Sequence, residues 1–80
     1  MKNEIKKQVQ LVKALVNNKI NNHDHEFLNT LLNRLNALEE NGNRNTTIKG
    51  AVKAYFETNL VEGYDEPLVI ELDKLEEMLD

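Results

Sequence analysis

The sequence predicts an all-α fold, an antiparallel bundle of four short helices in one domain that spans residues 1–80. Large apolar residues recur at steps of three and four, the spacing that places them on one face of a helix. Stretches rich in asparagine, or containing glycine or proline, separate these segments as loops do. No cysteine occurs, so helix packing or association must stabilise this small chain. We expect helices over about residues 2–18, 24–40, 46–60 and 67–79.

The most regular apolar pattern lies in residues 24–40, and we expect the other segments to pack on this helix. Asp24 is placed to accept hydrogen bonds from the free amides of the first turn, and Gly42 suits a left-handed end. Because its apolar residues share one face, this helix should form the centre of the core. These residues are Phe27, Leu28, Leu31, Leu32, Leu35 and Leu38.

The first helix is expected over residues 2–18, followed by a turn. The turn is indicated by the asparagine-rich run at residues 17–22, because asparagine tolerates left-handed backbone angles. The buried stripe of this helix comprises Ile5, Val9, Val12 and Val16, with Leu11 and Leu15 beside it.

The third helix is expected over residues 46–60, with Asn45 or Thr46 as its N-cap. Gly50 would lie inside it, at a cost of about 1 kcal/mol relative to alanine. The apolar stripe of this helix should dock on the second helix. It consists of Ile48, Ala51, Val52, Tyr55, Phe56 and Leu60.

Residues 67–79 fit a fourth helix that begins with Pro67, a residue suited to a first helical turn. The stretch from Leu68 to Leu72 also has the composition of a short strand, with a helical turn after it. A lone strand would have no partner in this chain, which favours the helix and leaves the strand as the alternative. The leucines at helical spacing are Leu68, Leu72, Leu75 and Leu79.

Charge is distributed unevenly along the chain, whose net charge is −4. Residues 1–20 contain five lysines and one acid, whereas residues 60–80 contain eight acids and one lysine. One interpretation is that the first and last helices are neighbours that attract each other, each exposed pair contributing less than about 1 kcal/mol. The other interpretation is that the acidic end meets a basic partner.

The residues needed for most reaction chemistry are missing or unsuitably spaced. The chain has no serine and no cysteine, which excludes acyl transfer through either nucleophile. His23 and His25 are two residues apart, whereas metal ligands on a helix converge at spacings of three or four. Gly42, Gly50 and Gly63 are isolated and form no phosphate-binding loop. We therefore expect a non-enzymatic protein with no catalytic residue, cofactor or metal ion.

Nucleic acid and membranes are not the expected partners. Lys2, Lys6 and Lys13 form a basic stripe, but both arginines lie outside it and the net charge is negative, unlike a typical DNA-binding module. No apolar run approaches the roughly 20 residues that span a bilayer, and no signal-peptide cleavage site follows the N-terminal lysines. We expect a cytoplasmic protein without membrane insertion.

Another protein is the expected partner, either a different chain or a second copy in a homodimer. Tyr64 lies outside the apolar stripes, in a turn where its ring is placed to contact a partner. The acids beside it and in the last helix would give this end a negative surface. The candidate partner-binding residues are Tyr64, Asp65, Glu66, Glu71, Asp73, Glu76 and Glu77.

A family resemblance rests on HEFLNTLLNRLNALEE, the polar link NGNRN, TTIKGAVKAYFETNL and VIELDKLEEML. In the spacing of their apolar positions these stretches resemble the immunity proteins of class II (pediocin-like) bacteriocins. The resemblance implies a cytoplasmic antiparallel four-helix bundle that protects the producing cell by engaging a sugar-uptake permease once the toxin has bound it. The alternative function is a small phage or mobile-element regulator or inhibitor, whose acidic C-terminal region binds a nucleic-acid-processing protein.

Overall fold

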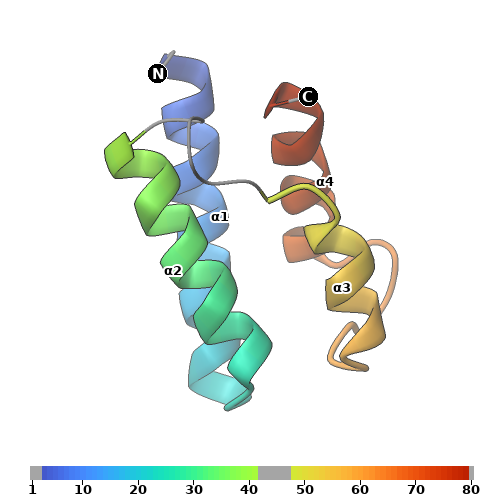
Figure 1. Ribbon diagram of the computed structural model, residues 1–80. Helices are drawn as coiled ribbons and strands as arrows, with labels where there is room; N and C mark the ends of the chain where they lie inside the picture. Colours follow the sequence, from blue (N-terminus) through green and yellow to red (C-terminus); the bar gives the residue numbers. More distant parts are fainter. Residues whose placement is uncertain (1–2, 42–47, 80) are drawn as a thin grey trace.

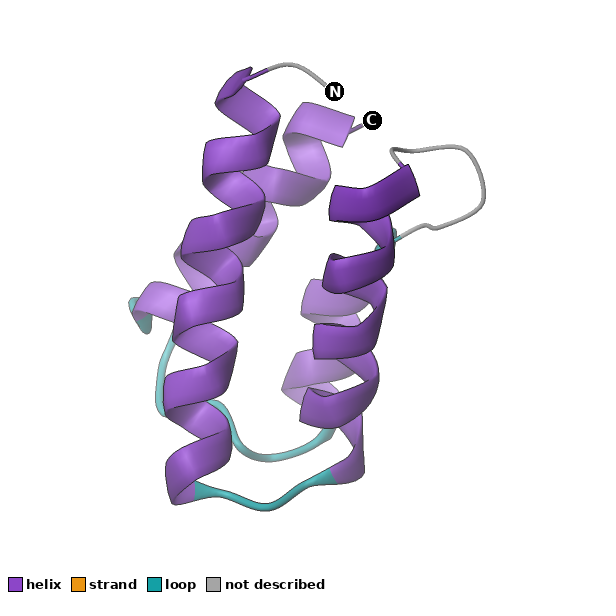
Figure 2. Cartoon of the chain, turned by 90° about the vertical axis from the view of Figure 1, so that its left-hand side faces the viewer, coloured by secondary structure: helices purple, strands orange, loops and turns teal. Residues whose placement is uncertain are grey.

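Four helices make up the part of the chain that the structure, a computed structural model, describes, which is residues 3–41 and 48–79 (Figure 1). These two ranges contain helices and loops and no strand (Figure 2). The all-α expectation is confirmed, and the alternative of a short strand at residues 68–72 is wrong. The helices are α1 (Asn3–Asn22), α2 (Glu26–Asn41), α3 (Ala51–Glu57) and α4 (Pro67–Leu79).

Successive helices run in opposite directions, as expected for an antiparallel bundle (Figure 1). α1 packs against both α2 and α4, while α3 rests mainly on α4. The expectation that the helix of residues 24–40 is central is therefore wrong. The third helix, expected to dock on it, packs mainly on α4 and meets α2 through the stacked rings of Phe27 and Tyr55, whose centroids lie 5.9 Å apart. α1 takes the central place because its two flanks contact different neighbours. Gln8 faces α4, and Lys13 faces α2.

The core lies where the apolar stripes of the four helices meet. Ile70 is 49% exposed, in agreement with its position off the helical stripe of α4. Burial of each larger apolar side chain stabilises the fold by about 1.5–3 kcal/mol. The buried apolar residues are Val9, Val12, Val16, Leu28, Leu31, Leu35, Leu38, Ile48, Ala51, Tyr55, Leu68, Val69, Leu72 and Leu75.

α1 continues to Asn22, so the turn predicted at residues 17–22 is wrong. The side-chain amide of Asn22 donates a hydrogen bond to the carbonyl of Asn18 at 3.1 Å, within the last turn. Lys19 of the same turn forms an ion pair with Glu66, with Nζ and Oε1 2.7 Å apart. These contacts outweigh the turn preference of asparagine, because tertiary context overrides local propensity.

α2 begins at Glu26, and His25 rather than Asp24 caps it. The backbone N–H of Phe27 donates to Nδ1 of His25 at 3.0 Å. The backbone N–H of Leu28 donates to the carbonyl of His25 at 3.1 Å. The ring nitrogen thus takes the role that a side-chain oxygen usually has at a helix N-cap, and Asp24 is exposed.

α3 is shorter than expected, because it begins at Ala51 and ends at Glu57. Gly50 precedes it with φ 81°, in the left-handed region that glycine adopts readily, so the expectation that Gly50 lies inside the helix is wrong. The backbone N–H of Ala51 donates to Oε1 of Glu76 at 2.8 Å, so a side chain of α4 caps this helix. After the helix, Asn59 has φ 66° and turns the chain.

Three residues to which the sequence assigns helix ends lie outside the described residues. They are Gly42, expected to end the second helix, and Asn45 and Thr46, the alternative caps of the third.

Replacement of Gly50 by alanine is expected to lower the free energy of unfolding by about 1–2 kcal/mol. At this positive φ an L side chain is strained, although a Cβ there would meet nothing within 4 Å. Inside a helix the same change would instead stabilise by up to about 1 kcal/mol. Urea denaturation gives the sign, with Lys53→Ala on the exposed side of α3 as a near-neutral control. A stabilised Gly50→Ala variant would contradict the left-handed conformation.

Candidate functional site

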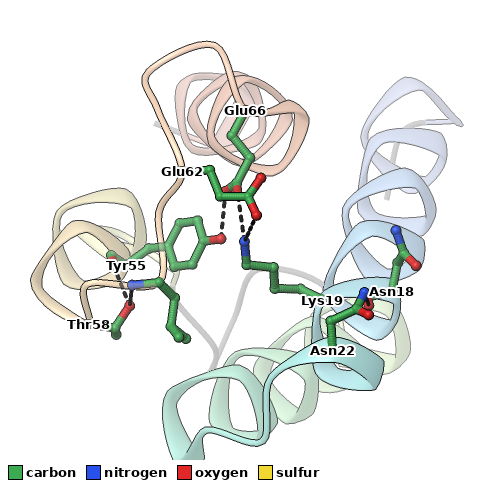
Figure 3. A network of polar contacts seen from close by, with 8 residues as sticks. Asn18, Lys19, Asn22, Tyr55, Thr58, Glu62 and Glu66 are labelled. Atoms are coloured by element: carbon green, nitrogen blue, oxygen red, sulfur yellow. Dashed lines mark hydrogen bonds and ion pairs between the residues drawn. The ribbon is translucent and has the colours of Figure 1, made fainter.

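A cluster of charged and hydroxyl groups joins three helices where α1 ends and α4 begins (Figure 3). Lys19 reaches into it from α1, Tyr55 from α3, and Glu66 from the residue before α4. Glu62, in the loop between α3 and α4, lies beside them. We call these four residues the Glu66 network.

Each carboxylate oxygen of Glu66 has its own donor. Nζ of Lys19 lies 2.7 Å from Oε1, and the hydroxyl of Tyr55 donates to Oε2 at 2.6 Å. The side chains of Lys19 and Glu66 are 10% and 8% exposed. Glu62 differs, because its side chain is 77% exposed and its Oε1 lies 3.9 Å from the same lysine nitrogen. Two carboxylates therefore share one ammonium group, and Glu66 makes the closer contact.

Burial and hydrogen bonding shift the pKa values of two members of this network. Burial by itself raises the pKa of Glu66, but the hydrogen bonds from Lys19 and Tyr55 and the lysine charge outweigh burial and lower that pKa. Burial is also the largest cause that raises the pKa of Tyr55, followed by its hydrogen bond to Glu66 and by the nearby carboxylate charges. The phenol therefore stays neutral and keeps donating. The Glu66 network connects α1, α3 and the start of α4.

The lowered pKa of Glu66 predicts that the Glu66 network stabilises the fold less in acid. Above pH 4.5, the ordinary pKa of a glutamate, Glu66 is ionised in both the folded and unfolded chains, and its stabilising contribution is complete. As the pH falls below that value, the unfolded chain binds the proton first, so stability is lost as the pH falls through the lower folded pKa. We expect the melting temperature of Glu66→Gln to depend less on pH in this window than that of the native sequence. Glu77→Gln, which changes an exposed acid, should retain the native slope; equal slopes for all three proteins would contradict the prediction.

Three of the predicted partner-binding acids make contacts within the bundle. Besides Glu66, the Oε1 atom and the carbonyl of Glu71 each accept a hydrogen bond from Nε2 of Gln8 at 2.9 Å. Glu76 caps α3. Glu71 and Glu76 lie on the two edges of the buried stripe of α4, so one faces α1 and the other faces α3. Their carboxylates serve the packing of α4.

The other predicted partner-binding residues lie at the surface. Tyr64 is 85% exposed, and its ring centroid lies 5.3 Å from that of Phe56 in a tilted arrangement. Asp65, Asp73 and Glu77 are exposed. Asp73 and Glu77 are four residues apart, so they share the outward side of α4.

An open pocket of about 430 Å³ adjoins the Glu66 network. Leu15 and Leu68 contribute apolar surface to it, and Asn18 and Asn22 contribute polar surface. The charged part of its lining comes from Lys19 and the two glutamates of the network. The pocket therefore combines apolar, amide and charged groups within reach of one small ligand group.

The two histidines have separate places. His23 lines the pocket, and His25 caps α2. Within the described ranges, no three histidine, cysteine, aspartate or glutamate side chains are grouped so that they could hold a metal ion. Among the helices of residues 3–41 and 48–79, none is long and apolar enough to cross a membrane.

The basic stripe expected on the first helix is partly used within the bundle. Lys13 forms an ion pair with Glu39 of α2 at 3.3 Å. Lys6 is exposed, and Lys2 lies outside the described residues. α1 and α4 are neighbours and are bridged by the Glu66 network, as one interpretation of the charge asymmetry requires.

No family model matches the chain. No characterised protein and no solved structure is significantly similar to it either. The resemblance to bacteriocin immunity proteins therefore stays a prediction.

Three members of these polar clusters, Lys19, Tyr55 and Gln8, were not predicted from the sequence. Tyr55 carried a usable signal, because a tyrosine inside an apolar stripe brings a hydroxyl that needs a partner. Lys19 lies in an asparagine-rich run and carries no such local signal. Its burial depends on the approach of the segment that leads into α4.

Proposed function

We propose that this chain is a non-enzymatic helical protein that acts by contact with another protein. The contact surface consists of the loop between α3 and α4 and the outward side of α4. Tyr64 carries the proposal, because it is a large aromatic residue that is 85% exposed. Tyrosine is enriched among the residues that dominate the binding energy of protein interfaces.

The ring of Tyr64 has a neighbour within the chain that supports its position. It packs against Phe56 with ring centroids 5.3 Å apart, an arrangement that aromatic pairs favour. A side chain that is held by such a contact loses less conformational entropy when a partner binds. Ile70, which is 49% exposed, adds apolar surface on α4.

Exposed acids accompany these apolar groups. Among the described residues, no ion pair involves Asp65, Asp73 or Glu77. We call these three residues the acidic face. Uncompensated charge of one sign steers a partner of the opposite charge and speeds its association. The favoured partner is therefore a protein with a basic surface.

Bacteriocin immunity is the specific form of this proposal that the family resemblance implies. The all-α bundle is the architecture expected for that family. The test is to express the chain in a strain sensitive to class II bacteriocins and to measure survival after challenge. Higher survival than with the empty vector, lost on Tyr64→Ala, would support immunity. Equal survival would exclude immunity toward the toxins tested.

The second candidate is a regulator or inhibitor that binds a nucleic-acid-processing protein through the acidic face. The excess of seven negative charges in residues 60–80 favours it. Such contacts weaken as salt screens them. Inhibition of a nuclease or polymerase that disappears at moderate ionic strength would support this candidate, whereas salt-insensitive capture would favour the first.

The acidic face can be tested by capture of a partner on the immobilised chain. Neutralising it with Asp65→Asn, Asp73→Asn and Glu77→Gln together should abolish capture of the partner that the native sequence retains. The matched control has three neutral substitutions at exposed lysines, and it should bind as before. An equal loss in both variants would contradict the proposal. The control substitutions are Lys6→Gln, Lys7→Gln and Lys53→Gln.

Tyr64→Ala is expected to weaken partner binding at least tenfold, roughly the effect of removing a central aromatic anchor. The melting temperature should change little, because the side chain is mostly exposed. Titration calorimetry with the captured partner and a thermal melt measure the two effects. Unchanged affinity would remove Tyr64 from the interface.

A further inference from the structure

The pocket beside the Glu66 network has an imbalance of charge. Both oxygens of Glu66 are engaged by Lys19 and Tyr55. Oε1 of Glu62 lies farther from the same ammonium nitrogen, at 3.9 Å, and the Glu62 side chain is 77% exposed. Because one ammonium group faces two carboxylates, one negative charge is left over, and a second cation in the pocket would neutralise it. That cation would pair with Glu62 and leave the Lys19–Glu66 contact in place.

The C-terminal end of α1 also favours a cation in this pocket. Asn18 and Asn22 belong to its last turns and line the pocket. The carbonyls at a helix C-terminus give it a partial negative charge that favours cations. Asn22 uses its side-chain N–H to bond the carbonyl of Asn18, which leaves its side-chain oxygen to accept. The helix end and Glu62 therefore both favour a positively charged donor group.

The remaining lining suits the stem of a long side chain. Leu15, Pro67 and Leu68 supply apolar surface. Arginine and lysine bury their methylene stems on such surface while the charged head stays near water. The volume of about 430 Å³ lies in the range of pockets that hold small ligand groups.

We propose that this pocket receives an arginine side chain of the partner protein, with its guanidinium group paired to Glu62. This inference rests on the proposed function, because the arginine belongs to the basic partner. Arginine is favoured over lysine because its planar fork can donate two hydrogen bonds to one carboxylate. A guanidinium group is also less strongly hydrated than an ammonium group. It therefore loses less hydration energy when it enters a pocket that already contains the charged Lys19.

The test uses Nα-acetyl-arginine amide as the probe and follows the amide resonances of the chain by NMR. Saturable shifts at Asn18, Asn22 and Leu68 are expected. Nα-acetyl-citrulline amide, a neutral molecule of nearly the same shape, should cause none, and the lysine analogue should bind more weakly. Free arginine, which carries an α-carboxylate, should not bind more tightly than the amide if the natural ligand is a residue within a protein.

Glu62→Gln should weaken binding of the arginine probe about tenfold, because it removes a charge-assisted pair. Glu77→Gln makes the same change on the acidic face away from the pocket and should leave probe binding within about twofold. Glu62 is mostly exposed, so the variant should keep the native melting temperature.

Three results would overturn the inference: no saturable shift with the arginine probe, equal shifts with citrulline, or native affinity in Glu62→Gln. None of these would affect the proposed function, which is tested by partner capture on the acidic face and by Tyr64→Ala. Conversely, the probe experiment contains no partner protein, so loss of partner capture leaves this test intact.

Discussion

Replacement of Glu66 by leucine is expected to lower the free energy of unfolding by about 3–5 kcal/mol. The change removes the carboxylate that lies 2.7 Å from Nζ of Lys19, and the side chain of this lysine is only 10% exposed. The ammonium group is therefore left in a mostly buried place without its close counter-ion. The change also removes the acceptor of the buried Tyr55 hydroxyl. Such a loss is a large share of the stability of a domain of this size. Urea denaturation followed by circular dichroism measures it.

Removal of all the polar groups that depend on Glu66 should restore most of the lost stability. The triple variant Lys19→Met, Tyr55→Phe and Glu66→Leu leaves neither a buried charge nor a buried hydroxyl without a partner. Replacement of a whole buried polar cluster by apolar groups is often neutral or stabilising. Two results would show that the Glu66 network does not hold these helices together. One is a Glu66→Leu variant as stable as the native sequence, and the other is a triple variant no more stable than the single one.

Leu31→Asp is expected to unfold the chain. Leu31 is 2% exposed and belongs to the core. Arg34 and Lys49 line a pocket beside it, but both are exposed at the surface, so an added carboxylate would be buried on the core side of α2. Burial of an unpaired charge costs more than about 4 kcal/mol, which approaches the whole stability of a small domain. Loss of the cooperative thermal transition and of amide chemical-shift dispersion would show the effect.

Ile70→Asp is the matched control for Leu31→Asp. It makes the same kind of change in another helix, but Ile70 is 49% exposed, so the new carboxylate stays in water. We expect its stability within about 0.5–1 kcal/mol of the native value. Native-like melting of Leu31→Asp would mean that the core is wrongly placed.

Periodicity predicted the helices whose apolar residues form continuous stripes. In α1, Val9, Val12 and Val16 of the predicted stripe are buried. In α2, four of the six predicted core residues are buried, and in α4 the leucines at 68, 72 and 75 are buried. These predictions were right because a repeat of three and four residues leaves one helical face to cover, whatever lies against it. Ile70 falls outside this stripe, a feature that fits the strand alternative, and in the helix it is half exposed.

Helix ends were predicted less well, because long-range contacts decide them. α1 runs through its asparagine-rich end, where Lys19 is held by Glu66. α3 starts after Gly50, where Glu76 of α4 supplies the cap. The partners of Lys19 and Ala51 lie 47 and 25 residues further along the chain, so no local pattern contains them.

The candidate surface was also only partly visible in the sequence. Seven residues were proposed from their acidity or position, and the chain alone offered no reason to divide them. The structure turns Glu66, Glu71 and Glu76 toward neighbouring helices. It leaves Tyr64, Asp65, Asp73 and Glu77 exposed.

The sequence by itself determined that this chain forms helices and which side of each helix is apolar, because both follow from residue spacing along one segment. Only the tertiary structure decided that α1 is the central helix and which acids pair inside the bundle. It also decided that a pocket with one cation and two carboxylates forms beside Glu66. These features depend on side chains brought together from distant segments, and an ion pair or a pocket exists only once the helices have packed.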